Sequence, residues 1–153
     1  QCGAAINGKE IGVARQINIT SEALNHAFHR GRNKQFSALC VHRDHITKLA
    51  PGAVVSASNE HSPVQAMIYE QGNISFWGMQ YHPEFSLDNV INSISEADSL
   101  FNKDREFKAE LIAARESPTG EAARRLGVLG NDLKPEVHRT ELANWLEHIP
   151  ATG

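Results

Sequence analysis

The sequence predicts an α/β domain, with strands in the N-terminal half of the chain and helices in the C-terminal half. Up to residue 81, apolar residues recur with a period of two, which is typical of half-buried strands. From Ser86 onward they recur with the helical period of about 3.6. The chain has 153 residues, which is enough for one compact domain with a sizeable core.

Composition and charge exclude several classes of function. The net charge is −3 at pH 7, so no basic field favours binding to nucleic acid or to an anionic membrane. No apolar run approaches the roughly 20 residues of a membrane-spanning helix. Lys9 and Glu10 interrupt the first apolar stretch, so no signal peptide is expected. Cys2 and Cys40 lack paired spacing, which predicts reduced thiols in a cytoplasmic protein.

The first part of the chain is predicted to contain a helix end, a strand and a short helix. Residues 1–7 are interpreted as the last turn of a helix, which Gly8 closes. A strand follows, because its apolar residues all fall on one parity: Ile11, Val13, Ile17 and Ile19. A short helix is expected over about 20–28, and the basic residues 29–32 are expected to form a solvated loop.

Further strands are predicted between residues 36 and 81. Alternating apolar residues predict strands over 36–42 and 53–57, with the turn signal Pro51-Gly52 before the second. Residues 64–69 and 74–81 are predicted to pair as an antiparallel hairpin.

Helices are predicted from Ser86 to the end of the chain. Ser86 is a suitable N-cap for the first helix, whose apolar positions have helical spacing: Leu87, Val90, Ile91, Ile94, Ala97 and Leu100. Others are expected over 105–115 and between 118 and 127. The last begins at Pro135, and its apolar side is expected to comprise Val137, Leu142, Trp145, Leu146 and Ile149.

The most informative segment is Met-Gln-Tyr-His-Pro-Glu-Phe at residues 79–85. Side chains two residues apart in an extended backbone project to the same face, and Pro83 favours that backbone. Glu84 is therefore expected to accept a hydrogen bond from one ring nitrogen of His82, which leaves the other nitrogen free to act as base and acid. Such a pair is two-thirds of a nucleophile–histidine–carboxylate triad.

Several segments in this order resemble the class I (triad-type) glutamine amidotransferases. Residues 78–84, Gly-Met-Gln-Tyr-His-Pro-Glu, are similar to the family's Gly-x-Gln-Phe-His-Pro-Glu signature. The upstream motifs agree in order and spacing, and they lie at residues 9–12, 42–52, 58–61 and 64–66. The match covers roughly residues 1 to 90. Residues 144–146, Asn-Trp-Leu, resemble a C-terminal helix in one branch of the family.

The resemblance implies a partial flavodoxin-like glutamine amidotransferase fold, which in the family is a parallel sheet with helices on both faces. Residues 1–101 would be the C-terminal part of that domain, and residues 102–153 a helical extension packed on or beside it. The family releases ammonia from glutamine through a cysteine thioester, usually for a synthetase domain or subunit. No cofactor is implied.

The resemblance also implies roles for individual residues. His82 would activate the cysteine thiol and protonate the leaving ammonia, and Glu84 would hold the His82 ring. His42, Arg43 and Asp44 would lie in the loop that helps to bind glutamine. A metal site that includes His42 and Asp44 is not expected, because no third ligand has a typical spacing.

Neither cysteine fits the family's nucleophile, which lies on a Gly-x-Cys-x-Gly turn between a strand and a helix. Cys2 lies just ahead of Gly8, and Cys40 lies inside a predicted strand. The nucleophile is therefore expected before Gln1 in a longer polypeptide, and this chain alone is expected to be inactive. Two alternatives stay open: a γ-glutamyl hydrolase of the same fold, and a non-catalytic binding or regulatory subunit.

Overall fold

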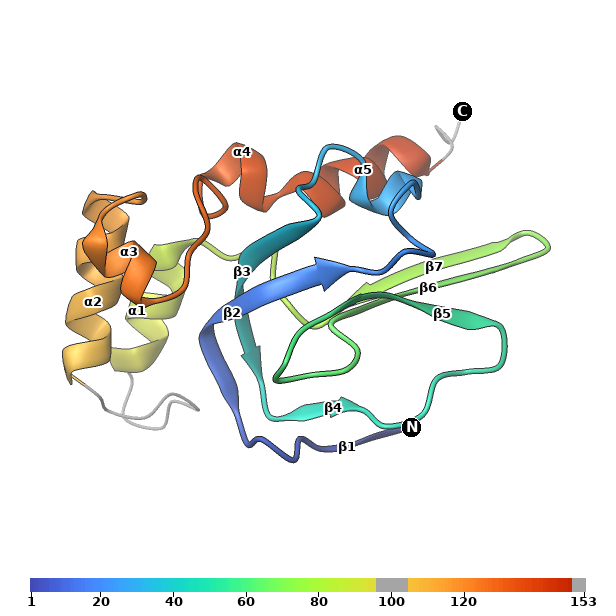
Figure 1. The fold of residues 1–153 in the computed structure, drawn as a ribbon, viewed down its shortest axis with the longest axis horizontal. Helices are drawn as coiled ribbons and strands as arrows, with labels where there is room; N and C mark the ends of the chain where they lie inside the picture. The colour runs from blue at the N-terminus through green and yellow to red at the C-terminus, as the bar shows by residue number, and fades with distance from the viewer. Residues whose placement is uncertain (96–104, 150–153) are drawn as a thin grey trace.

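The computed structural model describes residues 1–95 and 105–149, and it confirms the predicted α/β class (Figure 1). A five-stranded sheet with the order β3-β2-β5-β6-β7 lies at the centre. Its strands are β2 Glu10–Ile19, β3 Gln35–His42, β5 Ala53–Ser58, β6 Ala66–Gln71 and β7 Ile74–Met79. Two short strands, β1 Cys2–Ala4 and β4 Asp44–Ile46, form a separate pair.

The helices form two groups around the sheet (Figure 1). The first group contains α1 Leu87–Ser95, α2 Arg105–Glu116 and α3 Glu121–Arg125. The second contains α4 Pro135–His138 and α5 Thr140–His148, and α5 lies against the short 3₁₀ helix η1 Ala27–His29. Within the described ranges, the helices are all too short or too polar to cross a lipid bilayer.

The pairings between the described strands are antiparallel, whereas the resemblance implies a parallel sheet. A short turn accounts for the β6–β7 pair, because antiparallel neighbours can be joined by two residues whereas parallel ones need a long crossover. The predicted hairpin is confirmed as β6–β7, in which Gln71 pairs with Ile74. Gly72 in its turn has φ +57°, a conformation that glycine adopts without strain.

Strand β2 changes face halfway along its length. Val13 pairs with Leu39, but Ile17 pairs with Phe36, so β2 holds one extra residue between Ala14 and Ile17. Because of this β-bulge, the odd-numbered residues of β2 face one side of the sheet before the bulge and the other side after it. Val13 therefore packs towards the first helical group, and Ile17 packs into the core on the other face. The prediction that the apolar residues of this strand share one face is wrong for this reason.

The two faces of the sheet each carry a hydrophobic core. One core contains Phe28, Phe36, Trp77 and Tyr81, with Trp145 of α5 packed against it. The other joins the sheet to α1, α2 and α3, with Leu39, Val90, Leu111 and Leu126 among its buried members. Burial of each large apolar side chain stabilises the fold by about 2 kcal/mol. Strand β3 contributes to both cores, because its side chains alternate between the faces.

Two predictions for the first part of the chain are wrong. Residues 1–7 form β1 and a turn rather than a helix end, because β1 pairs with β4. Gly8 closes that turn by donating from its N–H to the Ala5 carbonyl. Residues 21–26 form turns that lead into η1 instead of a helix, and Phe28 of η1 is anchored in the core.

Helices α1, α2 and α3 lie where the sequence predicted them. Helix α1 begins directly after Ser86, whose Oγ accepts a hydrogen bond from the Asn89 N–H at 3.3 Å, as an N-cap does. Val90 and Ile91 are buried as expected. The predicted apolar positions 97 and 100 lie outside the described residues.

The last predicted helix is divided, and it presents a different face to the core. It breaks at Arg139 into α4 and α5. Leu146 and Ile149 were expected to pack inward, but they are 64 % and 42 % exposed. Glu141 and Asn144 are buried instead, because both side chains bond to the segment that precedes β3.

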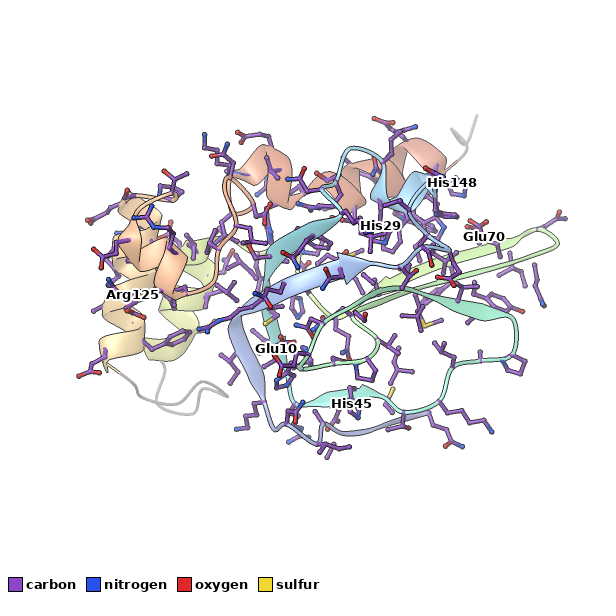
Figure 2. The ribbon with its side chains drawn as sticks, in the orientation of Figure 1. Glu10, His29, His45, Glu70, Arg125 and His148 are labelled. Carbon is purple, nitrogen blue, oxygen red and sulfur yellow. The ribbon has the colours of Figure 1, made fainter. Side chains whose placement is uncertain are left out.

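The prediction that residues 29–32 form a solvated loop is wrong for His29 and Arg32, although residues 30 and 31 are exposed in a turn. His29 lies beside α5 (Figure 2). His29 and Arg32 are both buried, and both face the carboxylate of Glu141. Their partner lies 109 residues beyond Arg32, so local sequence carries no signal of it.

We expect Gly12→Ala to lower the free energy of unfolding by about 3 kcal/mol, because two effects add. Gly12 has φ +91°, and a Cβ there would lie 2.3 Å from Cζ of Phe107. Gly8 has φ +77°, but a Cβ there would meet nothing within 4 Å, so Gly8→Ala should cost only about 1 kcal/mol through backbone strain. Urea unfolding of the full-length protein measures both changes. Equal losses in the two variants would contradict the assigned contact.

Candidate active site

His82 and Glu84 form the hydrogen bond that the sequence predicts. Nδ1 of His82 lies 2.7 Å from Oε1 of Glu84. A carboxylate can only accept, so the proton lies on Nδ1 and the lone pair of a neutral ring lies on Nε2. Within the described residues, no hydrogen bond engages Nε2. The side chains are 31 % and 55 % exposed, so a reacting group can reach them.

The backbone around His82 is anchored to the edge of β3. The His82 N–H donates to the Leu39 carbonyl at 2.8 Å, and Tyr81 forms a β-bridge with Cys40. The segment after β7 thus crosses to the edge of β3 that β2 leaves unpaired. The ring of Phe85 stacks on the His82 ring, with centroids 4.3 Å apart and planes 9° apart. These contacts restrict the imidazole to one orientation.

The carbonyl group of His82 has a partner that sequence reasoning missed. Nε2 of His138 lies 2.8 Å from the His82 oxygen, which can only accept. Burial lowers the pKa of His138, and the nearby Arg32 cation lowers it as well. The ring is therefore neutral at pH 7, with its proton on Nε2. The two histidines are 56 residues apart, so no local pattern indicates this contact.

The structure separates His42 from the His82–Glu84 pair. His42 lies three positions beyond Leu39 on β3, about 10 Å along the strand. Its Nε2 donates to Oε2 of Glu10 at 2.8 Å, and its Nδ1 lies 3.1 Å from the Asp44 carbonyl oxygen. Arg43 and Asp44 are exposed, with 4.0 Å between Nε and Oδ1.

Glu10 connects four of the segments that carry the family resemblance. It lies buried near the centre of the molecule (Figure 2). Besides His42, its carboxylate accepts hydrogen bonds from Asn59 Nδ2 at 2.7 Å and Gln65 Nε2 at 2.5 Å. Burial raises the pKa of the Glu10 carboxyl, but the three hydrogen bonds lower it by more, so the net pKa lies below its ordinary value. Sequence reasoning missed this role, although Glu10 lies within a matched motif.

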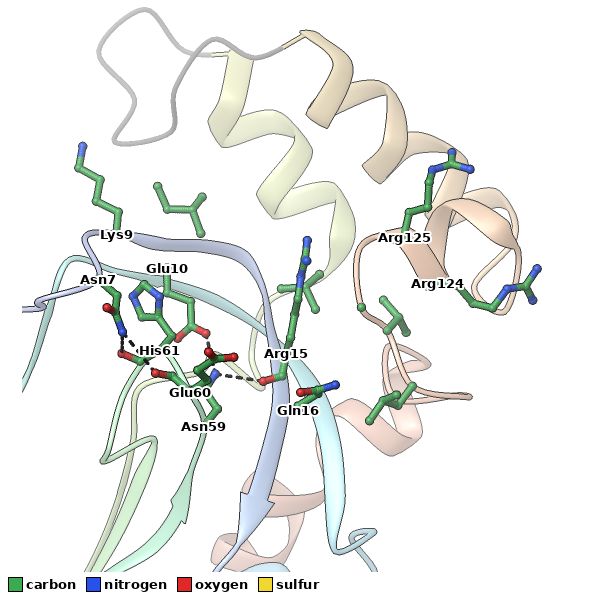
Figure 3. Close-up of a pocket in the computed structure, with 15 residues that line it drawn as sticks. Asn7, Lys9, Glu10, Arg15, Gln16, Asn59, Glu60, His61, Arg124 and Arg125 are labelled. Atoms are coloured by element: carbon green, nitrogen blue, oxygen red, sulfur yellow. Dashed lines mark hydrogen bonds between the residues drawn. The ribbon is translucent and has the colours of Figure 1, made fainter.

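A cleft of about 890 Å³ opens beside Glu10, between β2 and α3 (Figure 3). Its polar lining is rich in cations and amides, and includes Lys9, Arg15, Asn59, His61, Arg124 and Arg125. Neither His82 nor Glu84 lines it. We therefore do not assign this cleft to the candidate active site.

Cys40 lacks the surroundings of a catalytic thiol. Cys40 is buried in β3 and pairs with Tyr81. Burial raises the pKa of the Cys40 thiol well above its ordinary value, so little reactive thiolate forms. Cys2 is exposed on β1. Among residues 1–95 and 105–149, no group of three His, Cys, Asp or Glu side chains is arranged to hold a metal ion.

We expect Glu10→Gln to lower the free energy of unfolding at pH 7 by about 2 kcal/mol, because the new NH₂ group faces donors and leaves one unpaired. Since folding lowers the pKa of Glu10, the stability it contributes is present above its unfolded pKa of about 4.5 and is lost as pH falls through the folded value. The difference between wild type and variant should therefore shrink below about pH 4.5.

Urea unfolding of the full-length protein at pH 7 and pH 4 measures this difference. Glu60→Gln is the matched control, because Glu60 is an exposed carboxylate in the same region. It should change stability little at either pH. A Glu10→Gln effect that is the same at both pH values would contradict the expectation.

Comparison with known proteins agrees with the geometry of the chain. The family "Glutamine amidotransferase class-I" matches residues 1–97. A γ-glutamyl-L-1-hydroxyisopropylamide hydrolase from Pseudomonas sp. is 29 % identical over 152 residues, covering 92 % of this chain and 50 % of the relative. The chain therefore spans about half the length of the curated relative that it matches.

Solved structures show the same fold. A glutamine amidotransferase from Thermotoga maritima has a TM-score of 0.54 at 19 % identity, covering 96 % of this chain and 53 % of that one. A glutamine amidotransferase from Methylobacillus flagellatus has a TM-score of 0.58 at 14 % identity, covering 100 % of this chain and 57 % of that one. The chain thus has the fold of part of these flavodoxin-like enzymes, with an antiparallel sheet in the described part, and it belongs to the class I glutamine amidotransferase family.

Proposed function

We propose that the full-length protein hydrolyses the side-chain amide of glutamine, with His82 as general base and acid and Glu84 as its orienting carboxylate. The observation that carries this proposal is the 2.7 Å hydrogen bond from Nδ1 to Glu84, which leaves Nε2 of His82 without a described partner. The nucleophile is a cysteine thiol that this chain does not supply.

In this scheme His82 transfers two protons. Nε2 takes the proton of the thiol, and the thiolate attacks the side-chain carbonyl carbon of glutamine. The C–N bond then breaks as the imidazolium protonates the leaving nitrogen, which gives ammonia and a thioester. Water attacks the thioester and passes a proton to Nε2, which returns it to the departing thiolate as glutamate is released. Glu84 stabilises the imidazolium at both stages.

We further propose that the loop of His42, Arg43 and Asp44 binds glutamine. The exposed side chains of Arg43 and Asp44 carry charges opposite to the α-carboxylate and α-ammonium groups of the substrate. The bond from His42 Nε2 to Glu10 holds the start of this loop, and His42 Nδ1 lies 3.1 Å from the Asp44 carbonyl oxygen. The ammonia released would pass to a synthetase domain or subunit.

The chain divides, we propose, into residues 1–101 as part of the amidotransferase domain and residues 102–153 as a helical extension packed on it. The family match ends at residue 97, which supports a boundary near this point. Leu111 and Leu126 lie in a core with β3, which supports close packing of the extension on the sheet.

A second function is favoured by one observation. The relative that covers 92 % of this chain is a hydrolase of a γ-glutamyl amide. Glutamine and γ-glutamyl amides share the γ-carbonyl carbon that the thiolate attacks, and they differ only in the leaving nitrogen. The same His82–Glu84 pair could therefore protonate an alkylamine in place of ammonia.

We expect His82→Ala to lower the kcat of glutamine hydrolysis by about 10³-fold or more, because both proton transfers lose their carrier. Glu84→Gln should lower kcat by about 10²-fold. The amide oxygen can still accept the hydrogen bond from Nδ1, but the negative charge that stabilises the imidazolium is lost. Ammonia release by the full-length protein measures both. Glu22→Gln, at an exposed carboxylate, is the control and should retain full activity. Retained activity in His82→Ala would overturn the assigned role.

Substrate comparison separates the candidate functions. We expect kcat/KM for glutamine to exceed that for γ-glutamyl isopropylamide by at least about 10-fold, because a site built for ammonia release has little room for an alkyl group on nitrogen. The assay follows glutamate formation by the full-length protein with each substrate. The reverse order would favour the γ-glutamyl hydrolase, and turnover of neither by folded protein would favour a non-catalytic subunit.

A further inference from the structure

A buried ion pair connects α5 to the segment that precedes β3. The side chains of Arg32 and Glu141 are both fully buried. Nε of Arg32 donates to Oε1 of Glu141 at 2.9 Å, and Nη2 donates to Oε2 at 2.5 Å. Burying two charges is costly, so the pair adds little net stability, but separation of its partners leaves a buried charge and is strongly disfavoured. The pair therefore keeps α5 next to the segment that precedes β3.

The ion pair also positions the backbone of α4. Nη2 of Arg32 makes a further hydrogen bond to the carbonyl of His138 at 3.1 Å. His138 is the last residue of α4 and is 2 % exposed. With its carbonyl held by Arg32, its ring lies against the chain just beyond β7, where Nε2 donates to the His82 carbonyl.

The peptide groups of His82 are thereby held from two directions. Its N–H donates to Leu39 of β3, and its carbonyl accepts from His138 of α4 as well as from the Phe85 N–H at 3.1 Å. Fixing both peptide groups fixes the direction of the Cα–Cβ bond, and so the point from which the imidazole reaches Glu84. A displacement of about 1 Å at a reacting group is enough to lower a rate by about 10²-fold.

We propose that His138 is a positioning residue for His82: its Nε2–H holds the His82 carbonyl so that the imidazole keeps its hydrogen bond to Glu84 and presents Nε2 to the reacting groups. This inference rests on the function proposed above, in which His82 carries the protons. It gives His138 of α4 a role in positioning His82, although α4 lies beyond the residues that match the family.

Two variants of His138 test the role of the hydrogen bond itself. The terminal amide nitrogen of His138→Gln can occupy the place of Nε2 and donate to the same carbonyl. His138→Asn carries the same amide but is one methylene shorter, so it cannot reach. We expect kcat for glutamine to fall 10- to 100-fold in His138→Asn, with KM changed less than about two-fold, and to stay within about three-fold of wild type in His138→Gln.

Asn144→Ala is the matched control for general loosening of the extension. Asn144 Nδ2 donates to the carbonyls of Phe28 and Arg30, each at 2.9 Å, and it makes no contact with His82. The variant should lower the thermal midpoint of the full-length protein and leave kcat unchanged. Losses of kcat that follow the thermal midpoint equally in Asn144→Ala and His138→Asn would overturn the proposal, as would unchanged kcat in His138→Asn.

A measurement that needs no turnover keeps this proposal separate from the proposed function. The Nδ1–H proton of His82 is followed by NMR in the full-length protein, where its hydrogen bond to Glu84 slows exchange with water. We expect the signal in wild type and His138→Gln, and its loss to fast exchange in His138→Asn. A retained signal in folded His138→Asn would overturn the positioning role, even if the protein showed no amidase activity.

Discussion

The candidate site depends on the backbone hydrogen bond between the His82 N–H and the Leu39 carbonyl. It joins the segment that follows β7, the last strand in the order of the sheet, to the edge of β3, the first strand, that β2 does not use. Side chains of β3 alternate between the two cores, so the strand that anchors His82 is packed on both faces of the sheet. The proposed function requires such support, because a side chain that transfers protons must keep its position relative to the reacting groups.

Two buried carboxylates organise the polar interior in the same way. Glu10 gathers donors from three segments around β2, and Glu141 gathers Arg32 and His29 beneath α5. In each case the donors come from parts of the chain that are far apart in sequence. A buried charge without its partners costs several kcal/mol, so each cluster strongly disfavours arrangements in which these segments separate. The Glu10 cluster holds His42 at the end of β3, and the Glu141 cluster is linked through Arg32 and His138 to the His82 segment.

The groups that contact His82 come from increasingly distant parts of the sequence. The His82–Glu84 contact needs only two residues and an extended backbone between them. The Phe85 ring, one residue further, restricts the imidazole by stacking. The Leu39 carbonyl requires the sheet to form, and the His138 ring requires the helices beyond α3 to dock. Each of these contacts further restricts the orientation of the same imidazole. The last of them comes from α4, which lies beyond the residues that match the family.

Features that arise between neighbouring residues could be predicted from the sequence alone. The β6–β7 hairpin, the start of α1 at Ser86 and the His82–Glu84 contact all depend on side chains within a few positions of one another. Only the folded molecule shows the bulge in β2, the inward face of α5 and the burial of Arg32. The bulge changes which alternate residues of β2 face each core, and the pattern of apolar residues does not reveal this. Arg32 is buried because it pairs with Glu141, which lies 109 residues away in the sequence. Local sequence patterns predict the secondary structure that the backbone prefers. The free-energy cost of burying a charge depends instead on which group, distant in sequence, pairs with it in the folded molecule.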